Sequence, residues 1–417
     1  MDIAIVGAGI AGLVLALRLH EEGVPCRLYE AVPEIKPLGV GINILPHASE
    51  VLGGLGLEKA LTAEAVLTAE SVFFNRFGQL IYREPSGRAA GYRHPQYSIH
   101  RGRLHAVLLA AVRDRLGPGA VAVDHRCTGV AQDEDGAYLT FRTTTGDAPL
   151  PRVRAGGVVA CDGVHSVIRR QFHPGEGEPR YSGVNMWRGT AIGRPFLSGA
   201  SMVRIGWLDR GKLVVYPIRD DVDGAGGQLI NWVAEIETPH HLTRDWNRRG
   251  DLNDFIGAYE DWHFDWLDVP ALLRSSGAML EYPMVDQEPL DRWTFGRVTL
   301  LGDAAHPMVP RGSNGAGQAI LDAKALSTVL AGTGDVAAAF RAYEDQRRPA
   351  TTAVVLTNRR TPPDVIIREV RDRTGDRPFE RVEDVISHEE LAAISRRYKD
   401  VAGMSARSLM VGDQAVI

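Results

Sequence analysis

The chain has 417 residues, a formal net charge of −5 and an isoelectric point near 6.2. This length exceeds one ordinary hydrophobic core, so two or three domains are predicted. The charge balance excludes the basic footprint that a nucleic-acid-binding protein carries.

Apolar residues and cysteines exclude two further classes. No stretch approaches the roughly 18 to 20 consecutive apolar residues of a membrane-spanning helix. Asp2 stands where a signal peptide has its basic region. Cys26, Cys127 and Cys161 are widely separated and lack metal-ligand spacing. We therefore expect reduced thiols, no metal site, and a cytoplasmic protein that binds neither membrane nor nucleic acid.

A glycine motif follows the first apolar run, residues 3–6. Gly7, Gly9 and Gly12 have GxGxxG spacing, with Ala11 between them, and a helical stretch follows. Gly7 permits a tight turn, Gly9 lets the backbone approach a pyrophosphate, and Gly12 allows close packing of helix and sheet. The motif predicts a dinucleotide site at the helix N-terminus. A glycine turn without a ligand is the alternative.

A second apolar run, residues 26–29, ends in Glu30. A carboxylate at this place can accept a hydrogen bond from a ribose hydroxyl, and it repels a 2′-phosphate. The dinucleotide is therefore predicted to be FAD or NAD rather than NADP.

The next segment, residues 36–43, is predicted to be a loop at the cofactor. Pro37, Gly39 and Gly41 prevent a helix there, and Lys36 begins it. The chain then alternates between expected helices and strands, in the order helix 46–62, strands within 71–82, helix 101–115 and β-meander 121–160. Because Arg101 opens its helix, it is a candidate phosphate clamp.

Two apolar runs, residues 157–160 and 298–301, end in acidic turns. Ligands of parallel sheets bind at the carboxyl ends of strands. Asp303 can therefore hold a ribityl hydroxyl, whereas Asp162 and Arg169 can brace the pyrophosphate loop and meet a nicotinamide cofactor. An ordinary strand-ending turn is the alternative at both places.

A glycine loop over residues 310–317 opens another expected helix. Backbone N–H groups and the helix dipole around Gly315 and Ala316 would stabilise negative charge on a flavin ring. Strands dominate residues 180–285, the candidate substrate region. The nucleotide-binding domain is therefore predicted to be discontinuous.

In this order, these pieces resemble the single-component flavin-dependent aromatic monooxygenases, such as para-hydroxybenzoate and salicylate hydroxylases. The resemblance implies an α/β fold, in which a Rossmann-type FAD-binding domain carries an inserted mainly-β substrate domain and a helical C-terminal region. The implied FAD-binding domain comprises residues 1–70, 98–178 and 280–355. The substrate domain comprises 71–97 and 179–279, and the C-terminal helical region is 356–417. The family's FAD contacts carry over to Gly7, Gly9, Gly12, Glu30, Arg101, Asp162 and Asp303.

Longer strings resemble one branch of this family, the phenazine-modifying monooxygenases of pyocyanin biosynthesis. These strings are residues 37–43, 95–102, 186–189 and 282–286. Lys36 departs from the family, where many relatives carry arginine, so a guanidinium contact to the flavin edge is not expected. A second GxGxxG between strand and helix is missing, which fits the family's transient docking of NAD(P)H at the surface.

The resemblance also implies the chemistry. NAD(P)H reduces a tightly bound FAD, O2 adds at flavin C4a, and the hydroperoxide hydroxylates an electron-rich ring in a site that excludes water. Tyr216 is expected to contact the substrate, and His306 either passes protons or makes a structural hydrogen bond. Candidate pocket walls, each with core packing as its alternative, are Met186, Trp187, Met202, Tyr216, Trp232, Met284, Pro307 and Met308.

The predicted function is FAD-dependent, NAD(P)H-consuming hydroxylation of a small aromatic or heteroaromatic molecule in secondary metabolism. One alternative is a flavin epoxidase or Baeyer–Villiger oxygenase acting on a polyketide, and another is a non-enzymatic redox sensor. The sequence leaves open the substrate, the regiochemistry, coupled loss of a carboxylate, and the choice between NADH and NADPH. It also leaves open whether the protein is a monomer or a homodimer, since the last helices either form a dimer contact or cap the core.

Overall fold

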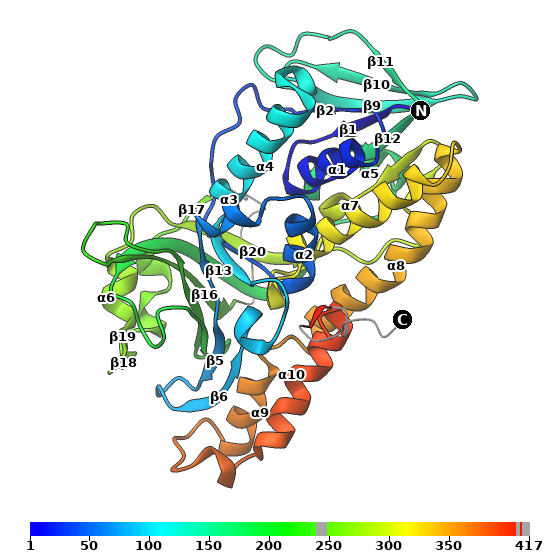
Figure 1. The fold of residues 1–417 in the computed structure, drawn as a ribbon. Helices are drawn as coiled ribbons and strands as arrows, with labels where there is room; N and C mark the ends of the chain where they lie inside the picture. The colour runs from blue at the N-terminus through cyan, green and yellow to red at the C-terminus, as the bar shows by residue number, and fades with distance from the viewer. Residues whose placement is uncertain (239–247, 406–408, 411–417) are drawn as a thin grey trace.

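A six-stranded sheet, parallel except at one edge, organises the upper half of the molecule (Figure 1). The computed structural model describes residues 1–238, 248–405 and 409–410. The strands of the sheet, in spatial order, are β21 (Thr294–Phe295), β22 (Val298–Leu300), β12 (Gly157–Ala160), β1 (Ile3–Val6), β2 (Cys26–Tyr29) and β8 (Val121–Ala122). They come from three distant parts of the chain, so the nucleotide-binding half is assembled from separate segments.

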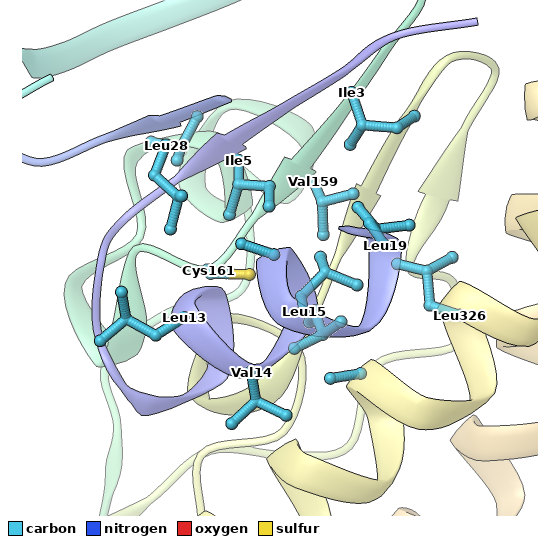
Figure 2. Packing of buried hydrophobic residues seen from close by; sticks show 14 of the residues in the cluster. Ile3, Ile5, Leu13, Val14, Leu15, Leu19, Leu28, Val159, Cys161 and Leu326 are labelled. Atoms are coloured by element: carbon cyan, nitrogen blue, oxygen red, sulfur yellow. The ribbon is translucent and has the colours of Figure 1, made fainter. Parts of the chain in front are cut away.

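The core of this half follows from the apolar runs of β1 and β12. Every residue of these two strands is buried, as parallel strands covered on both faces require. Leu13 and Leu15 of the following helix belong to the same buried cluster as Ile5 and Val159 of the sheet (Figure 2). The helices around this sheet are α1 (Ile10–Glu21), α4 (Arg101–Leu116), α5 (Val167–Phe172), α7 (Gly315–Ala331) and α8 (Val336–Arg360). A β-meander of β9 (Arg126–Gln132), β10 (Ala137–Arg142) and β11 (Val153–Ala155) lies at its upper end (Figure 1).

A second, eight-stranded sheet forms the substrate half. Its strands, in spatial order, are β17 (Arg248–Arg249), β20 (Leu280–Asp286), β13 (Arg180–Gly193), β16 (Gln228–Glu237), β15 (Gly211–Arg219), β14 (Ser201–Trp207), β5 (Glu70–Phe74) and β6 (Leu80–Pro85). One face covers an aromatic cluster that includes Trp187, Trp232, Phe255 and Tyr259. The smaller elements are the sheet of β3 (Gly41–Ile44), β7 (Tyr97–His100) and β4 (Ala65–Leu67), the pair β18 (His263–Phe264) and β19 (Leu267–Asp268), and helix α6 (Val269–Arg274).

The C-terminal helices α9 (Val365–Thr374) and α10 (His388–Ala402) lie beside the outer strands β5 and β6 (Figure 1). Ile366, Val370 and Leu391 share a buried cluster with Phe73 and Ile81 of those strands. These helices therefore cap the core. Residues 406–408 and 411–417 of the expected C-terminal region lie outside the described residues.

Two expectations about boundaries need correction. The helix expected over 46–62 is divided into α2 (Pro46–Gly54) and α3 (Glu58–Thr62), because the chain turns at Gly56 with φ +71°. Strand β20 begins at the expected boundary but pairs with β13 in the eight-stranded sheet. We therefore propose that the substrate domain extends through Asp286, and we keep the rest of the division as a proposal.

Within the described residues, no helix combines the length and the apolar character needed to cross a membrane.

Candidate functional site

In the turn between β1 and α1, Gly7 and Gly12 have no room for a side chain, whereas Gly9 does. A Cβ on Gly7, where φ is +101°, would lie 2.4 Å from the carbonyl oxygen of Cys161. A Cβ on Gly12 would lie 2.1 Å from the carbonyl oxygen of Gly7. At Gly9 an added Cβ would meet no atom within 4 Å. The turn thus leaves open space directly in front of the α1 N-terminus, where unpaired N–H groups favour an anion.

Glu30 lies at this turn, and neither Glu30 nor Lys36 lines the large cavity described below. The Glu30 carboxylate accepts hydrogen bonds from the backbone N–H groups of Ala8, at 2.8 Å, and Val32, at 3.1 Å. It therefore holds the glycine turn against the end of β2. The Lys36 ammonium is exposed and pairs with Glu34 at 3.2 Å, so it faces solvent rather than the cavity.

A cavity of about 1220 Å³ runs from the glycine turn to the eight-stranded sheet. Loops from both halves of the molecule line it, as is usual for a cofactor site between two domains. The expected cofactor residues that line it are Gly9, Ala11, Gly41, Arg101, Arg169, Asp303, Gly315 and Ala316. The expected catalytic or pocket residues that line it are Met186, Met202, Tyr216, Pro307 and Met308.

Asp303 opens onto the cavity at the end of β22. Its position deep in the cleft raises the pKa of its carboxyl group, whereas the nearby His306 and Arg101 groups oppose the rise. Gly302 makes the turn before it with φ +64°. An open carboxylate at the carboxyl end of a parallel strand can accept hydrogen bonds from ligand hydroxyl groups.

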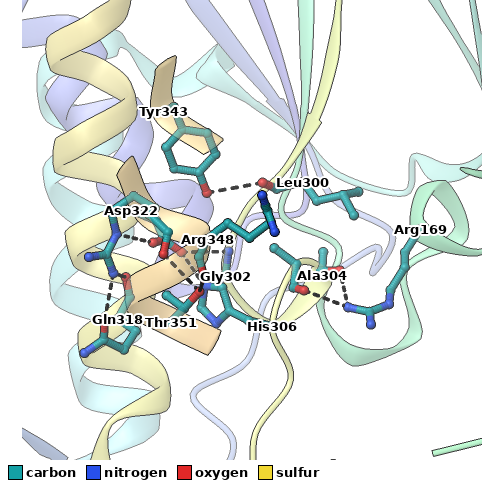
Figure 3. A network of polar contacts seen from close by, with 12 residues as sticks. Arg169, Leu300, Gly302, Ala304, His306, Gln318, Asp322, Tyr343, Arg348 and Thr351 are labelled. Atoms are coloured by element: carbon teal, nitrogen blue, oxygen red, sulfur yellow. Dashed lines mark hydrogen bonds and ion pairs between the residues drawn. The ribbon is translucent and has the colours of Figure 1, made fainter. Parts of the chain in front are cut away.

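Asp162 and Arg169 brace the neighbouring loop from behind. The Asp162 carboxylate accepts a hydrogen bond from the N–H of Val167 at 2.9 Å and does not line the cavity. The Arg169 guanidinium donates to the carbonyl oxygens of Ala304 and Ala305, each at 2.9 Å (Figure 3). Arg169 thus ties the turn after β12 to the turn after β22.

His306 belongs to a buried polar network rather than to the cavity wall. Its Nε2 atom lies 2.5 Å from the Asp322 carboxylate, which also accepts the N–H of Gly302 at 3.2 Å (Figure 3). The other Asp322 oxygen accepts from Arg347 Nε at 2.7 Å. His306 is 3% exposed and does not line the cavity, so the structure favours the structural hydrogen bond over the catalytic role.

The N-terminus of α7 is held by the C-terminal helix α10. Asn314 donates from Nδ2 to the Tyr398 hydroxyl at 2.9 Å, and that hydroxyl donates to Asn358 Oδ1 at 2.7 Å. A Cβ on Gly312 would lie 1.6 Å from the same hydroxyl, so α10 packs directly on this loop. Asn314 lines the cavity, and its Oδ1 atom is buried without a hydrogen-bond partner in the described chain. No sequence motif points to Tyr398.

The substitution Tyr398→Phe is expected to weaken FAD binding about tenfold, because the Asn314 amide loses a buried partner worth roughly 1 to 2 kcal/mol. Titration of the apoprotein with FAD measures this directly. Tyr343→Phe is the matched control, since the Tyr343 hydroxyl donates to the carbonyl oxygen of Leu300 at 3.2 Å and does not touch this loop. Equal FAD affinities for wild type and Tyr398→Phe would refute the positioning role.

Three expected pocket residues prove to be core residues. Trp187 stacks on Phe255 with ring centroids 5.0 Å apart, and Trp232 donates to Ser276 Oγ at 2.6 Å. Met284 is buried in a small cluster with Val184. Neighbouring residues of a strand point to opposite faces, so Met186 lines the cavity whereas Trp187 enters the aromatic cluster.

The eight-stranded sheet places Tyr216 and several charged side chains in the same wall. Burial raises the pKa of Tyr216, although Arg188 and Arg204 oppose the rise, so its hydroxyl is protonated near neutral pH. Arg188 donates to the carbonyl oxygen of Gly41 at 2.8 Å. Arg188, Arg204 and Lys212 were missed in the sequence, where charges within apolar strand runs were the available signal.

The residues present fit FAD. The open space at Gly9 suits a pyrophosphate at a helix N-terminus, and the open carboxylate of Asp303 suits hydroxyl groups farther along the cavity. The unpartnered Asn314 Oδ1 atom offers a further contact at the start of α7.

Comparison with known proteins agrees with this geometry. The FAD binding domain family matches residues 1–186 and 272–358, more than half of the chain. The chain is 41% identical over 409 residues to the phenazine 1,6-dicarboxylic acid hydroxylase PhzS of Lysobacter antibioticus, covering 97% of this chain and 98% of that protein. The chain belongs to the FAD-dependent monooxygenases.

Two further similarities support this assignment. The 3-amino-4-hydroxybenzoate 2-monooxygenase of Streptomyces cremeus is 35% identical over 366 residues, covering 86% of each chain. The structure of Klebsiella pneumoniae HpxO complexed with FAD and uric acid has a TM-score of 0.70 and 23% identity, covering 97% of this chain and 93% of that one, and shows the same fold.

The predicted fold class, the resemblance to the phenazine-modifying branch, the FAD cofactor and the enzymatic function are thereby confirmed. FAD-dependent monooxygenases use NAD(P)H and O2 as cosubstrates. The alternative of a non-enzymatic redox sensor is removed.

Proposed function

We propose that this FAD-dependent monooxygenase hydroxylates a small aromatic or heteroaromatic carboxylic acid, whose carboxylate binds Arg188. The proposal depends on the surroundings of the Arg188 guanidinium group. Arg188 lines the cavity, its Nε atom is buried without a hydrogen-bond partner, and it forms no ion pair within the described chain. A guanidinium placed in this way favours a carboxylate, which it can bind through two parallel hydrogen bonds.

The names of two relatives support the substrate class. PhzS is described as a phenazine 1,6-dicarboxylic acid hydroxylase, and the Streptomyces cremeus enzyme as a 3-amino-4-hydroxybenzoate 2-monooxygenase. Both of those substrates are aromatic carboxylic acids.

The wall around Arg188 suits an aromatic ring. Met186, Met202 and Met308 offer adaptable apolar surface in the cavity and exclude water from it. We propose that Tyr216 donates a hydrogen bond to the substrate, since its hydroxyl stays protonated. Pro307 completes this end of the cavity.

The other end of the cavity is proposed to hold FAD. The chemistry that FAD supplies in this family is oxidation of NAD(P)H and activation of O2. Gly9 and Ala11 would face the pyrophosphate, Arg101 would clamp phosphate, and Asp303 would accept ribityl hydroxyls. The backbone around Gly315 and Ala316 would stabilise negative charge at the start of α7. Glu30, Asp162 and Arg169 would hold the surrounding turns in place.

Turnover of the FAD-loaded protein tests the proposal. Phenazine-1-carboxylate and substituted benzoates are expected to accelerate NAD(P)H oxidation and to gain one oxygen atom from ¹⁸O-labelled O2. The matched carboxamides are expected to react poorly. Equal turnover of acids and amides would count against carboxylate recognition, and a product with oxygen inserted into a C–C bond would indicate a Baeyer–Villiger oxygenase.

The substitution Arg188→Gln is expected to weaken binding of an aromatic carboxylate by about 10- to 100-fold, as loss of a buried charge-assisted pair does. Binding of the matched amide should change less than about threefold. The Kd values come from perturbation of the flavin absorption spectrum. Arg194→Gln is the control, because Arg194 is an exposed arginine just after the same strand. An equal loss for acid and amide would show that Arg188 only supports the loop at Gly41.

A further inference from the structure

We infer that Asp364 sets which substrate charges the cavity accepts, by neutralising two buried cations of its wall. This inference rests on the proposed function, because it concerns the same aromatic-acid site. Asp364 lies immediately before α9, in the C-terminal region, and lines the cavity together with residues of the eight-stranded sheet.

Asp364 belongs to a charge quartet with Arg204, Lys212 and Glu235. One Asp364 oxygen lies 2.9 Å from Arg204 Nε, and the other pairs with Lys212 Nζ. Lys212 Nζ also lies 3.0 and 3.1 Å from the two oxygens of Glu235. All four side chains are buried and line the cavity, so the two cations and two anions of the quartet balance each other. Arg311, a further cation of the cavity wall, lies close enough to Asp364 to help hold down its pKa.

Asp364 is the member on which Arg204 depends. Lys212 has a second acidic partner in Glu235, whereas the other contacts of Arg204 are neutral. These are the Ser71 hydroxyl, at 2.8 Å, the Met202 sulfur, at 3.6 Å, and the Phe73 ring, whose centroid lies 5.1 Å from the guanidinium carbon. Without Asp364, Arg204 would be a buried guanidinium that faces the cavity with no counterion, and such a group attracts a carboxylate.

Two parts of the cavity wall therefore have different roles. Arg188 donates to the Gly41 carbonyl but has no acidic partner in the described chain, so a substrate carboxylate can pair with it. Arg204 and Lys212 are already neutralised, so this part of the wall suits uncharged ring edges and hydrogen-bonding groups. The Asp364 carboxylate therefore occupies the position beside Arg204 that a substrate carboxylate could otherwise take. It determines specificity without contacting the substrate carboxylate at Arg188.

Charge-changing variants of the FAD-loaded protein test this inference. The probes are phenazine-1-carboxylate with its carboxamide, and benzoate with benzamide, titrated against the flavin absorption spectrum. The ratio of acid to amide affinity is expected to rise about tenfold in Asp364→Asn. It should fall by a similar factor in Lys212→Met, and the double variant Lys212→Met/Asp364→Asn should return to the wild-type ratio because the quartet is neutral again.

The control is Asp286→Asn. Asp286 is another buried acid of the same cavity, but its partner is Arg359, at 2.7 Å, and not a member of the charge quartet. An unchanged ratio in Asp364→Asn and in Lys212→Met would overturn the inference, as would an equal rise in Asp286→Asn. If Asp364→Asn does not fold, the single variant Lys212→Met, which keeps Asp364, still gives the predicted fall. If wild type binds acid and amide equally, the proposed function fails, whereas the shifts between variants still decide the role of Asp364.

Discussion

The substitution Gly9→Ala is expected to lower FAD affinity by at least about 100-fold while leaving the apoprotein nearly as stable as wild type. Gly9 has φ −72°, which alanine adopts without strain, and its added methyl group would meet no protein atom within 4 Å. The methyl group would instead occupy the space in front of α1 that the pyrophosphate needs. Titration with FAD and thermal unfolding of the apoprotein measure the two effects separately.

Gly12→Ala is the informative counterpart. Its methyl carbon would lie 2.1 Å from the carbonyl oxygen of Gly7, so the turn itself must move. This variant is therefore expected to lose both FAD binding and apoprotein stability. Wild-type FAD affinity in Gly9→Ala would show that the pyrophosphate does not lie at this turn.

The substitution Asp322→Asn is expected to destabilise the protein by about 3 to 5 kcal/mol, the cost of leaving buried charges without a partner. Asp322 is fully buried and contacts His306, Arg347 and the backbone of Gly302. Because Gly302 precedes Asp303, the retained FAD should also decrease. Urea unfolding of the apoprotein and the flavin content of the purified protein measure these effects. Asp345→Asn, an exposed acid on α8, should change neither.

The pH dependence of this loss has a definite sign. Burial alone would raise the pKa of Asp322, but His306 and Arg347 outweigh it and hold the pKa below its ordinary value. Ionised Asp322 therefore contributes stability above the unfolded pKa of about 3.9, and this contribution disappears as the pH falls through the folded pKa. The difference between wild type and Asp322→Asn should shrink below about pH 4. A difference that grows in acid would contradict this account.

The FAD end of the site was largely predictable because local sequence determines it. The spacing of Gly7, Gly9 and Gly12 directly reflects the geometry of a strand, a turn and a helix N-terminus. Asp303 could be placed at the cavity because an apolar strand immediately precedes it. Glu30 and Lys36 were harder, since a side chain near the cofactor can as well hydrogen bond to the turn or face solvent.

The substrate end was less predictable. The sequence predicts β13 and β16 as strands but not which residues face the cavity, so it leaves Trp187 and Trp232 as candidates for either the pocket or the core. The structure packs both on the face away from the cavity. A large aromatic side chain in a strand suits a core and a pocket equally well. Pairing with neighbouring strands determines to which face of the sheet that side chain points.

By itself the sequence determined a dinucleotide site and the α/β class, because both depend on short patterns with fixed backbone consequences. The choice of FAD and of the oxygenase family came from the resemblance of longer strings to known monooxygenases. Only the tertiary structure decided what surrounds the substrate. Asp364 and Tyr398 reach the cavity or its loop from a helical region more than 40 residues beyond Gly315. Contacts between such distant segments arise from packing and charge pairing in three dimensions, for which a linear pattern contains no signal.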